Sequence, residues 1–183
     1  MPTIISHAAV PLAIGIGLGR GRIPSRLLLA GVVAAIAPDL DVVAFKLGIA
    51  YAEAFGHRGA SHSLLFALLL AAGASAAAPL LRTSRRTSFF FILAAAVSHP
   101  LLDMLTNGGL GVALFWPVSD LRYFAPWQVI EVSPLSLRRV FSAQGLAVMR
   151  SELAWVWAPC AVAAAIGVLI RRDIPSAGRG DRA

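Results

Sequence analysis

Histidine and aspartate side chains at a few short spacings are the residues of this sequence that could do chemistry. His99 and Asp103 are four residues apart, so on a helix their side chains project from one face. Imidazole and carboxylate groups together are the ligands that zinc, manganese or iron take at open catalytic sites. The apolar residues 87–97 come directly before the pair. The sequence therefore predicts a helix that carries part of a metal site to the edge of a membrane.

Other segments offer the same kinds of side chain. Asp39 and Asp41 follow a proline and are two residues apart, which suits a turn that presents two carboxylates. His57 and His62 are five residues apart, too far for one straight helical face, so a loop must bring one or both inward. His7, near the start of the chain, completes the four histidines. We expect these residues to hold one or two divalent ions, with zinc favoured.

Two residues of this set are candidates for catalysis rather than ligation. A carboxylate that no ion occupies could act as a general base, and Asp41 is our candidate. Arg58 is flanked by candidate ligands, and its guanidinium could hold a phosphate or carboxylate through paired hydrogen bonds. The predicted metal ligands are His7, Asp39, His57, His62, His99 and Asp103.

Each residue also has a plainer interpretation when it is taken alone. His7 could be an interfacial polar residue, Asp39 could end a helix after its proline, and Arg58 could contact lipid headgroups. The pair of His99 and Asp103 could simply stabilise its helix. An aspartate at the centre of a membrane helix costs about 2.5–3.5 kcal/mol, and less at its end. That cost favours a functional interpretation of the pair.

The elements that must position these residues are apolar. Hydrophobic residues make up 58% of the 183 positions, charged residues only 14%, and the mean hydropathy is +0.77. Soluble domains carry about 25% charged residues, so the composition excludes a water-soluble domain. The net charge of +7 arises from arginines in short clusters between apolar blocks, which is typical of membrane topology signals rather than of nucleic-acid binding. The lone Cys160 excludes a disulfide or a cysteine metal site within one chain.

Five apolar blocks predict an all-α, multispanning transmembrane helix bundle. The blocks cover residues 4–19, 27–37, 64–81, 88–105 and 153–170, and the second has a weaker continuation to residue 45. The first lacks a cleavage pattern, so we expect a retained span. A short amphipathic helix is predicted before the last block, with Ser136 as its cap and Leu137, Val140, Phe141 and Val148 on its apolar side. We expect residues 1–172 to form the membrane domain and residues 173–183 a polar, flexible tail.

Arginine clusters predict the orientation of the bundle. They follow the first, third and fifth blocks: Arg20, Arg22 and Arg26, then Arg82, Arg85 and Arg86, then Arg171 and Arg172. The positive-inside rule makes all three clusters cytoplasmic, with the N-terminus outside and the C-terminus inside, although Arg122, Arg138, Arg139 and Arg150 fall on the outer side. All four histidines and the three aspartates named above then lie at the outer membrane face. This convergence predicts a shared site.

The sequence resembles the YdjM-like family of inner-membrane proteins, which are described as predicted metal-dependent hydrolases and as LexA-binding. The resemblance rests on His7, on residues 38–41, 57–63, 98–103 and 106–109, and on Trp116-Pro117, in the order of the family. It implies an inner-membrane location, a hydrolase site and a LexA-like regulatory partner. The LexA association comes from the family description alone.

More remotely, the helix with histidine and aspartate four residues apart is similar to the ligand pattern of all-α zinc-dependent phospholipases C and related zinc nucleases. That likeness implies metal ligation by His99, Asp103, His7, and His57 or His62, with Asp39 or Asp41 as base. No histidine follows His99, so a third metal subsite of that kind would lack its ligands.

We therefore predict an integral membrane hydrolase that acts on a phosphoester or other ester at the outer membrane face through metal-activated water. The main alternative is a metal- or proton-handling transporter, in which intramembrane histidine and aspartate carry the ion. Clustering of the polar groups at one face, rather than along a path through the bilayer, argues against it. A third hypothesis is a non-enzymatic scaffold that engages a regulatory partner through its basic loops. The lipid bilayer is the expected surrounding, and direct nucleic-acid binding is not expected.

Overall fold

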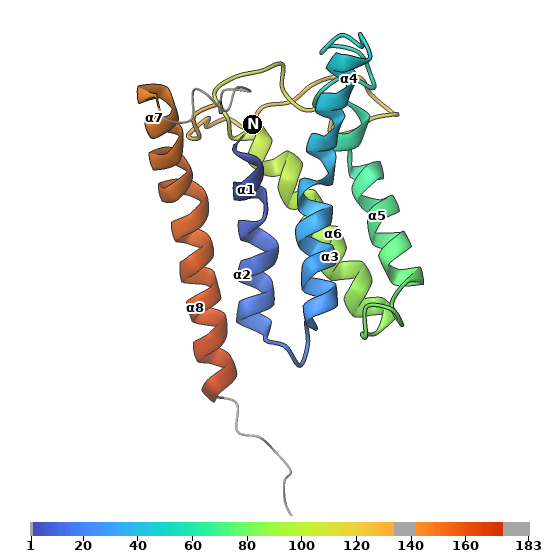
Figure 1. Cartoon of the computed structure of the whole chain (residues 1–183), viewed down its shortest axis with the longest axis vertical. Coiled ribbons are helices and arrows are strands. Elements are labelled where there is room, and N and C mark those ends of the chain that lie inside the picture. The colour runs from blue at the N-terminus through green and yellow to red at the C-terminus, as the bar shows by residue number, and fades with distance from the viewer. Residues whose placement is uncertain (1, 134–141, 174–183) are drawn as a thin grey trace, which may run out of the picture.

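The computed structural model describes residues 2–133 and 142–173. Its helices run side by side, and the connections between them lie at the two ends of the bundle (Figure 1). The helical elements are α1 (Ile4–His7), α2 (Ala9–Leu18), α3 (Ser25–Ile36), η1 (Ala37–Val42), α4 (Val43–Lys46), η2 (Ala60–His62), α5 (Leu64–Ala76), α6 (Arg85–Met104), α7 (Ala143–Glu152), η4 (Leu153–Trp157) and α8 (Ala158–Asp173). Within the described ranges, extended pairing is limited to two isolated bridges, between Thr106 and Ile130 and between Val112 and Tyr123. The predicted all-α class is confirmed.

Three of the helices are long and apolar enough to cross a membrane: Ser25–Lys46, Arg85–Met104 and Ala143–Arg172. The apolar helices Ile4–Leu18 and Leu64–Ala76 are shorter. At 1.5 Å per residue they are about 22 and 20 Å long, against about 30 Å for the hydrocarbon layer. Local thinning of the bilayer accommodates helices of this length. Five apolar helices thus stand where the sequence predicts about five spans.

The structure differs from the predicted boundaries at two places, and the weaker continuation that was predicted for the second block is helical. The second span continues through η1 and α4 to Lys46, because Pro38 lies in the first turn of η1 and tolerates helix there. The third ends at Ala76, near Pro79, since the residue before a proline disfavours helix. The amphipathic segment and the last span form one continuous helix. Ser142 caps its start, because the Ser142 side-chain oxygen accepts a hydrogen bond from the backbone N–H of Gly145. The predicted cap Ser136, with Leu137, Val140 and Phe141, lies outside the described residues.

Small residues allow the helices to pack closely. The core between α3, α5 and α6 contains Leu27, Phe91 and Ile92 among alanines, which bring the backbones together. On the other side of the bundle α8 packs against α2, and a Cβ added at Gly167 would lie 2.7 Å from the Cα of Gly17. Large apolar side chains such as Leu69, Phe90 and Ile166 are exposed on the outer surface, as expected for helices in lipid. The bundle is therefore held by close backbone contacts rather than by a large central core.

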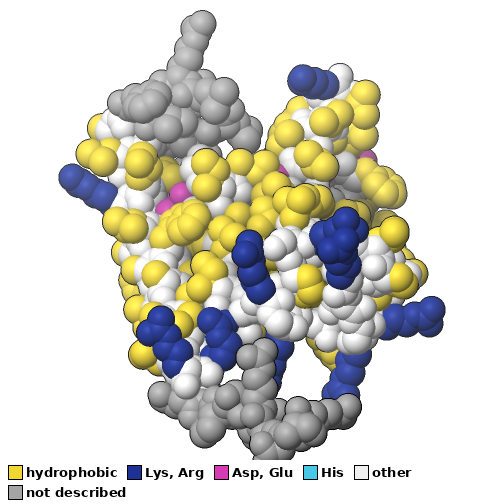
Figure 2. All heavy atoms as spheres, turned by 60° about the horizontal axis from the view of Figure 1, so that its bottom comes forward, with side chains coloured by type: hydrophobic (Ala, Val, Ile, Leu, Met, Phe, Trp, Pro, Cys, Tyr) yellow, Lys and Arg dark blue, Asp and Glu magenta, His cyan; other side chains and the backbone are white. Residues whose placement is uncertain are grey.

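The three arginine clusters and the histidines occupy opposite ends of the bundle, whereas Arg58 and Arg122 lie at the end of the histidines. The α2–α3 connection, the start of α6 and the end of α8 lie at the lower end in Figure 1, and Figure 2 shows lysine and arginine side chains around that end. The predicted site residues belong to α1, η1, η2, the preceding loop and the last turns of α6, at the upper end. The fold therefore places the candidate chemistry at one end of the bundle. Which end faces the cytoplasm stays a prediction.

Candidate metal centre

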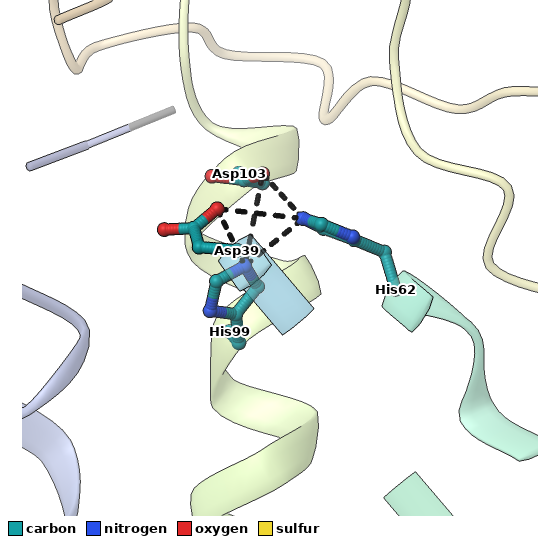
Figure 3. Close-up of side chains that lie close together, drawn as sticks. All are labelled: Asp39, His62, His99 and Asp103. Atoms are coloured by element: carbon teal, nitrogen blue, oxygen red, sulfur yellow. Dashed lines mark hydrogen bonds and ion pairs between the residues drawn. The ribbon is translucent and has the colours of Figure 1, made fainter. Parts of the chain in front are cut away.

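Four buried side chains from three elements converge at the upper end of the bundle (Figure 3). Asp39 comes from η1, His62 from η2, and His99 and Asp103 from α6, and none exposes more than 2% of its surface. The Nε2 atoms of His62 and His99 are 3.0 Å apart. Asp39 Oδ1 lies 3.5 Å from His99 Nε2 and 3.8 Å from His62 Nε2, and Asp103 Oδ2 lies 3.3 Å from His62 Nε2. These atoms form the central group of the site.

The spacing and chemistry of the central group fit a divalent metal ion. Two atoms that bind one tetrahedral zinc ion at about 2.0–2.1 Å lie about 3.3 Å apart, close to the observed spacings. None of the four oxygens of Asp39 and Asp103 accepts a hydrogen bond. Asp103 is paired with Arg58 at 3.0 Å, but Asp39 has only imidazoles beside it, so a bound cation would offset the cost of burying that carboxylate. Two histidines and two aspartates also suit zinc or manganese.

Backbone and side-chain contacts orient both histidines toward this group. His99 Nδ1 lies 2.6 Å from the carbonyl oxygen of Ala35 and donates to it, which leaves the Nε2 lone pair directed into the group. His62 Nδ1 lies 3.1 Å from Asp41 Oδ2, with the same effect on its own Nε2. Metal-binding histidines characteristically donate their second nitrogen to a carbonyl or a carboxylate in this way.

The carboxylates around His62 favour its charged form. Burial acts to lower the pKa of this imidazole, but the neighbouring carboxylates of Asp103 and Asp41 outweigh burial and raise the pKa to about 9. Without an ion, the His62 proton thus supplies positive charge to the group. A metal ion bound there would replace that proton.

Asp41 and His57, both predicted functional residues, lie beside the central group rather than in it. Asp41 Oδ1 lies 2.6 Å from His57 Nδ1, and Oδ2 accepts from Ser61 Oγ at 2.6 Å and from the backbone N–H of Arg58 at 3.1 Å. Asp41, His57 and His62 offer atoms within 4.8 Å of one another, so they form a second set that could hold an ion. Their mutual hydrogen bonds already satisfy much of that set. These contacts favour the orientation of His62 as the role of Asp41.

Arg58 is fully buried and directs its guanidinium at the protein itself. Its Nε lies 3.0 Å from Asp103 Oδ2, Nη1 donates to the carbonyl of Gly108 at 2.8 Å, and Nη2 donates to Thr106 Oγ1 at 2.9 Å. The sequence predicts a substrate-binding role, whereas these contacts favour a role in holding Asp103. Segment 106–109 supplies the acceptors, which sequence reasoning did not foresee. Gly109 is required there, because at φ 91° an added Cβ would lie 2.8 Å from Arg58 Nη1.

His7 reaches the site from the short helix α1. Its ring stacks on that of His99, with 3.7 Å between centroids and 18° between planes. His7 Nε2 lies 3.6 Å from Asp103 Oδ1 and 3.8 Å from Asp39 Oδ2. His7 thus touches the side of the aspartates that faces away from His62.

Glu152 holds α1 in place and was missed by sequence reasoning. Its carboxylate accepts hydrogen bonds from the backbone N–H of Thr3, from Thr3 Oγ1 at 2.7 Å and from Ser6 Oγ at 2.7 Å. Trp157 Nε1 donates to Ser6 Oγ at 2.9 Å. The only sequence signal for Glu152 is an acidic residue directly before an apolar block. Its partners, almost 150 positions away, have no local signature.

Comparison with known proteins identifies the family. The sequence profile of the YdjM inner membrane protein family matches residues 1–174. The chain belongs to the YdjM inner membrane protein family. A curated relative, inner membrane protein YbcI of Escherichia coli (strain K12), is 49% identical over 160 residues, which is 87% of this chain and 92% of the relative. No solved structure matches the chain significantly.

Membership of the YdjM family confirms the resemblance that the sequence motifs indicated. It also places the protein in the inner membrane, in agreement with its apolar helices. Within this YdjM protein, Asp39, His62, His99 and Asp103 form a buried group that could hold a metal ion.

Proposed function

We propose that this protein is a metal-dependent hydrolase that cleaves a phosphoester or other ester at the headgroup layer of the outer membrane face. The central group of Asp39, His62, His99 and Asp103 carries the proposal, because its four donor atoms lie within 4.8 Å of one another. The group lies in the last turn of α6 and in the segments that follow α3 and precede α5. That depth suits a substrate whose scissile bond lies near the headgroups.

The proposal assigns a separate role to each residue. Asp39, His62, His99 and Asp103 would hold a divalent ion, with zinc favoured. A divalent ion in this group would polarise a substrate oxygen and lower the pKa of a water molecule at the site. Asp41 and the Ala35 carbonyl orient the two histidines. Arg58 fixes Asp103 through its Nε.

The contacts of Asp41 bear on its predicted role as general base. Asp41, our sequence candidate, has both oxygens occupied by donors from His57, Arg58 and Ser61. Its contacts support a positioning role more than proton transfer. A LexA-like partner stays an expectation from the family description.

The test of this proposal compares Asp103→Asn with the matched control Asp120→Asn, because Asp120 is an exposed aspartate of the same end of the bundle. The purified proteins are loaded with zinc, washed, and analysed for metal and for hydrolysis of a chromogenic phosphodiester, a chromogenic carboxylic ester and phospholipid vesicles. We expect bound metal and hydrolysis in the parent protein and in Asp120→Asn. Asp103→Asn is expected to lower metal affinity by about 100-fold and to abolish hydrolysis. A metal-loaded parent protein that cleaves none of the three substrates would overturn the proposal.

One observation favours the transport alternative, namely the complete burial of the central group. His62, His99 and Asp103 each have an exposed fraction of 0%, which suits a dehydrated ion as much as an ester. Proteoliposomes that contain a zinc-sensitive dye separate the two functions. Zinc uptake that Asp103→Asn abolishes, in protein without esterase activity, would establish transport instead of hydrolysis.

A further inference from the structure

His7 lies at the candidate metal centre but makes no hydrogen bond to the central group. Both ring nitrogens of His7 are buried and make no hydrogen bond. A buried imidazole without hydrogen bonds is unfavourable, since it has given up its contacts with water. The atoms nearest to His7 Nε2 that bear charge are carboxylate oxygens of Asp103 and Asp39, at 3.6 and 3.8 Å.

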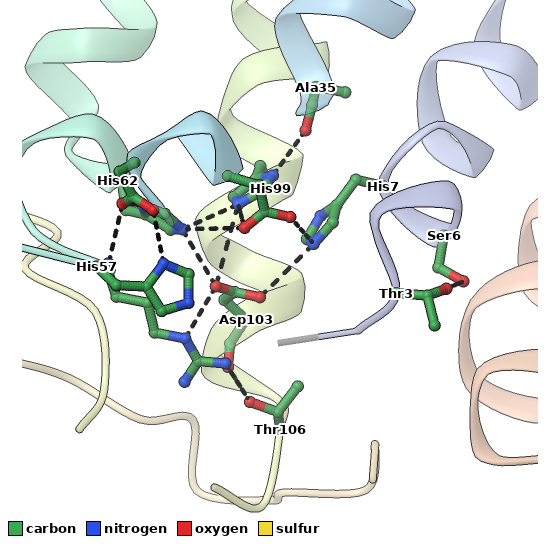
Figure 4. Close-up of polar contacts among 12 residues, drawn as sticks. Thr3, Ser6, His7, Ala35, His57, His62, His99, Asp103 and Thr106 are labelled. Atoms are coloured by element: carbon green, nitrogen blue, oxygen red, sulfur yellow. Dashed lines mark hydrogen bonds and ion pairs between the residues drawn. The ribbon is translucent and has the colours of Figure 1, made fainter. Parts of the chain in front are cut away.

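The two aspartates present different oxygens to the two sides of the site. Asp39 Oδ1 and Asp103 Oδ2 face His62 and His99, whereas Asp39 Oδ2 and Asp103 Oδ1 face His7. Figure 4 shows His62 and His7 on opposite sides of the Asp103 carboxylate. Asp103 Oδ2 is paired with Arg58 Nε at 3.0 Å, whereas both oxygens of Asp39 and Asp103 Oδ1 have lone pairs free for a cation. Each carboxylate therefore has one oxygen on each side.

We propose that His7 Nε2, Asp39 Oδ2 and Asp103 Oδ1 form a second divalent-cation position, and that the two aspartates bridge it to the position between His62 and His99. This inference rests on the proposed function, whose ion occupies the first position. Carboxylates that bridge two ions about 3.5–4 Å apart are a recurring design of enzymes that hydrolyse phosphoesters. The second position has three protein donors and leaves room in the coordination shell for a substrate oxygen.

The two distances from His7 Nε2 to the carboxylate oxygens support this position. Donor atoms of a zinc or manganese ion lie about 3.0–3.7 Å apart when each is 2.0–2.2 Å from the ion. The distance from His7 Nε2 to Asp103 Oδ1, 3.6 Å, lies at the upper end of that range, and the distance to Asp39 Oδ2, 3.8 Å, lies just beyond it. Contraction by a few tenths of an ångström is within the reach of the His7 and Asp39 side chains, which no hydrogen bond restrains.

The fold also fixes the direction of the His7 ring. Stacking on His99 at 3.7 Å sets the plane of the imidazole, so that Nε2 points at the aspartates. Glu152 fixes the start of α1 through Thr3 and Ser6. A residue that served only to fill space beside His99 would not need this orientation. The second position is thus built by the N-terminal segment, which the long helix Ala143–Arg172 holds in place.

Manganese provides the test, because two carboxylate-bridged Mn²⁺ ions give an exchange-coupled electron paramagnetic resonance spectrum and a single ion does not. The full-length parent protein, its His7→Gln variant and its His99→Ala variant are titrated with Mn²⁺ in detergent. We expect two bound ions per chain and a coupled spectrum in the parent protein. His7→Gln is expected to bind one ion with an uncoupled spectrum. The ion that it retains shows that the variant is folded.

The possible outcomes separate this inference from the proposed function. A single uncoupled ion in the parent protein, or two ions in His7→Gln, would overturn the second position and leave the first intact. Failure of the parent protein to bind any ion would overturn both. Loss of all binding in His99→Ala, together with one retained ion in His7→Gln, supports two positions of unequal strength, since the first has four protein donors and the second three.

Discussion

At the scale of single residues, charge compensation explains most contacts of the candidate metal centre. Asp103 is paired with Arg58 at 3.0 Å and approaches His62 at 3.3 Å, all three fully buried. Removing one partner of such a buried pair leaves an uncompensated charge and typically costs about 3–5 kcal/mol. Arg58 therefore holds the acidic group together before any ion binds. An arginine that binds substrate would instead be expected to expose part of its guanidinium.

The raised pKa of His62 predicts a pH-dependent metal affinity. At pH values below about 9, an incoming ion must displace the His62 proton, so apparent affinity should rise about tenfold per pH unit as the pH approaches 9. The stability of the metal-free protein should instead fall as the pH rises. Its stabilisation by charged His62 is complete below about 6.5 and is lost as the pH rises to about 9.

Isothermal titration with zinc at several pH values, together with the proton release into weak buffer, measures this coupling. Unfolding of the metal-free protein over the same pH range measures the opposite trend. An affinity that does not change between pH 6.5 and 8.5 would contradict the assignment of His62 as a ligand.

At the scale of elements, close helix contacts bring the site residues together. α6 supplies His99 and Asp103, and α3 continues into η1, which supplies Asp39. Glu152, at the end of α7, accepts a hydrogen bond from Ser6 and so holds α1 in place. The α2–α8 contact depends on glycines, since a Cβ at Gly167 would lie 2.7 Å from the backbone of Gly17. Loss of this contact would move the helix that carries Glu152.

The glycine contact predicts the effect of a single methyl group. Gly167→Ala should push α8 away from α2 and lower the free energy of unfolding by about 1–3 kcal/mol, as overpacking of a close contact does. Gly73→Ala is the matched control, because nothing lies within 4 Å of the added Cβ in α5. That control should be neutral or stabilise the helix by up to about 1 kcal/mol.

Thermal unfolding of both variants in the same detergent is the measurement. Equal midpoints for Gly167→Ala and Gly73→Ala would mean that the α2–α8 contact does not limit stability.

At the scale of the whole molecule, the arginine clusters and the acidic site residues lie at different ends of the bundle. Lysine and arginine side chains surround the lower end (Figure 2), and the elements that carry the histidines and aspartates of the site lie at the upper end (Figure 1), where Arg58 and Arg122 bind to the protein itself. Arginine in short loops keeps those loops on the cytoplasmic side during insertion. The separation therefore predicts a site that faces away from the cytoplasm.

Cysteine labelling tests this orientation. Ala52→Cys and Gly21→Cys, each in a background with Cys160→Ala, place one exposed thiol at the upper and one at the lower end. An impermeant maleimide should label Ala52→Cys in cells with a permeable outer envelope, and Gly21→Cys only after the inner membrane is opened. The reverse pattern would invert the orientation, and equal labelling of both would contradict a spanning bundle.

Local sequence determined the helices, their approximate bounds and the end of the bundle at which each polar residue lies. Apolar length sets whether a helix can span lipid, and arginine spacing distinguishes the two ends, so both properties can be read without any long-range contact. The four-residue spacing of His99 and Asp103 likewise determined that they share one face of α6. Family membership could also be recognised from short motifs.

Only the tertiary structure decided which neighbours meet. Asp39 and Asp41 both belong to η1, where residues two apart point in directions about 120° apart, so one enters the central group and the other holds His62. Two further contacts join segments that are far apart in the chain: the ion pair of Arg58 with Asp103 and the hydrogen bond between Thr3 and Glu152. No local propensity encodes such pairs, because they arise from how the helices pack. Sequence thus determined which residues reach this end of the bundle, and packing determined their roles there.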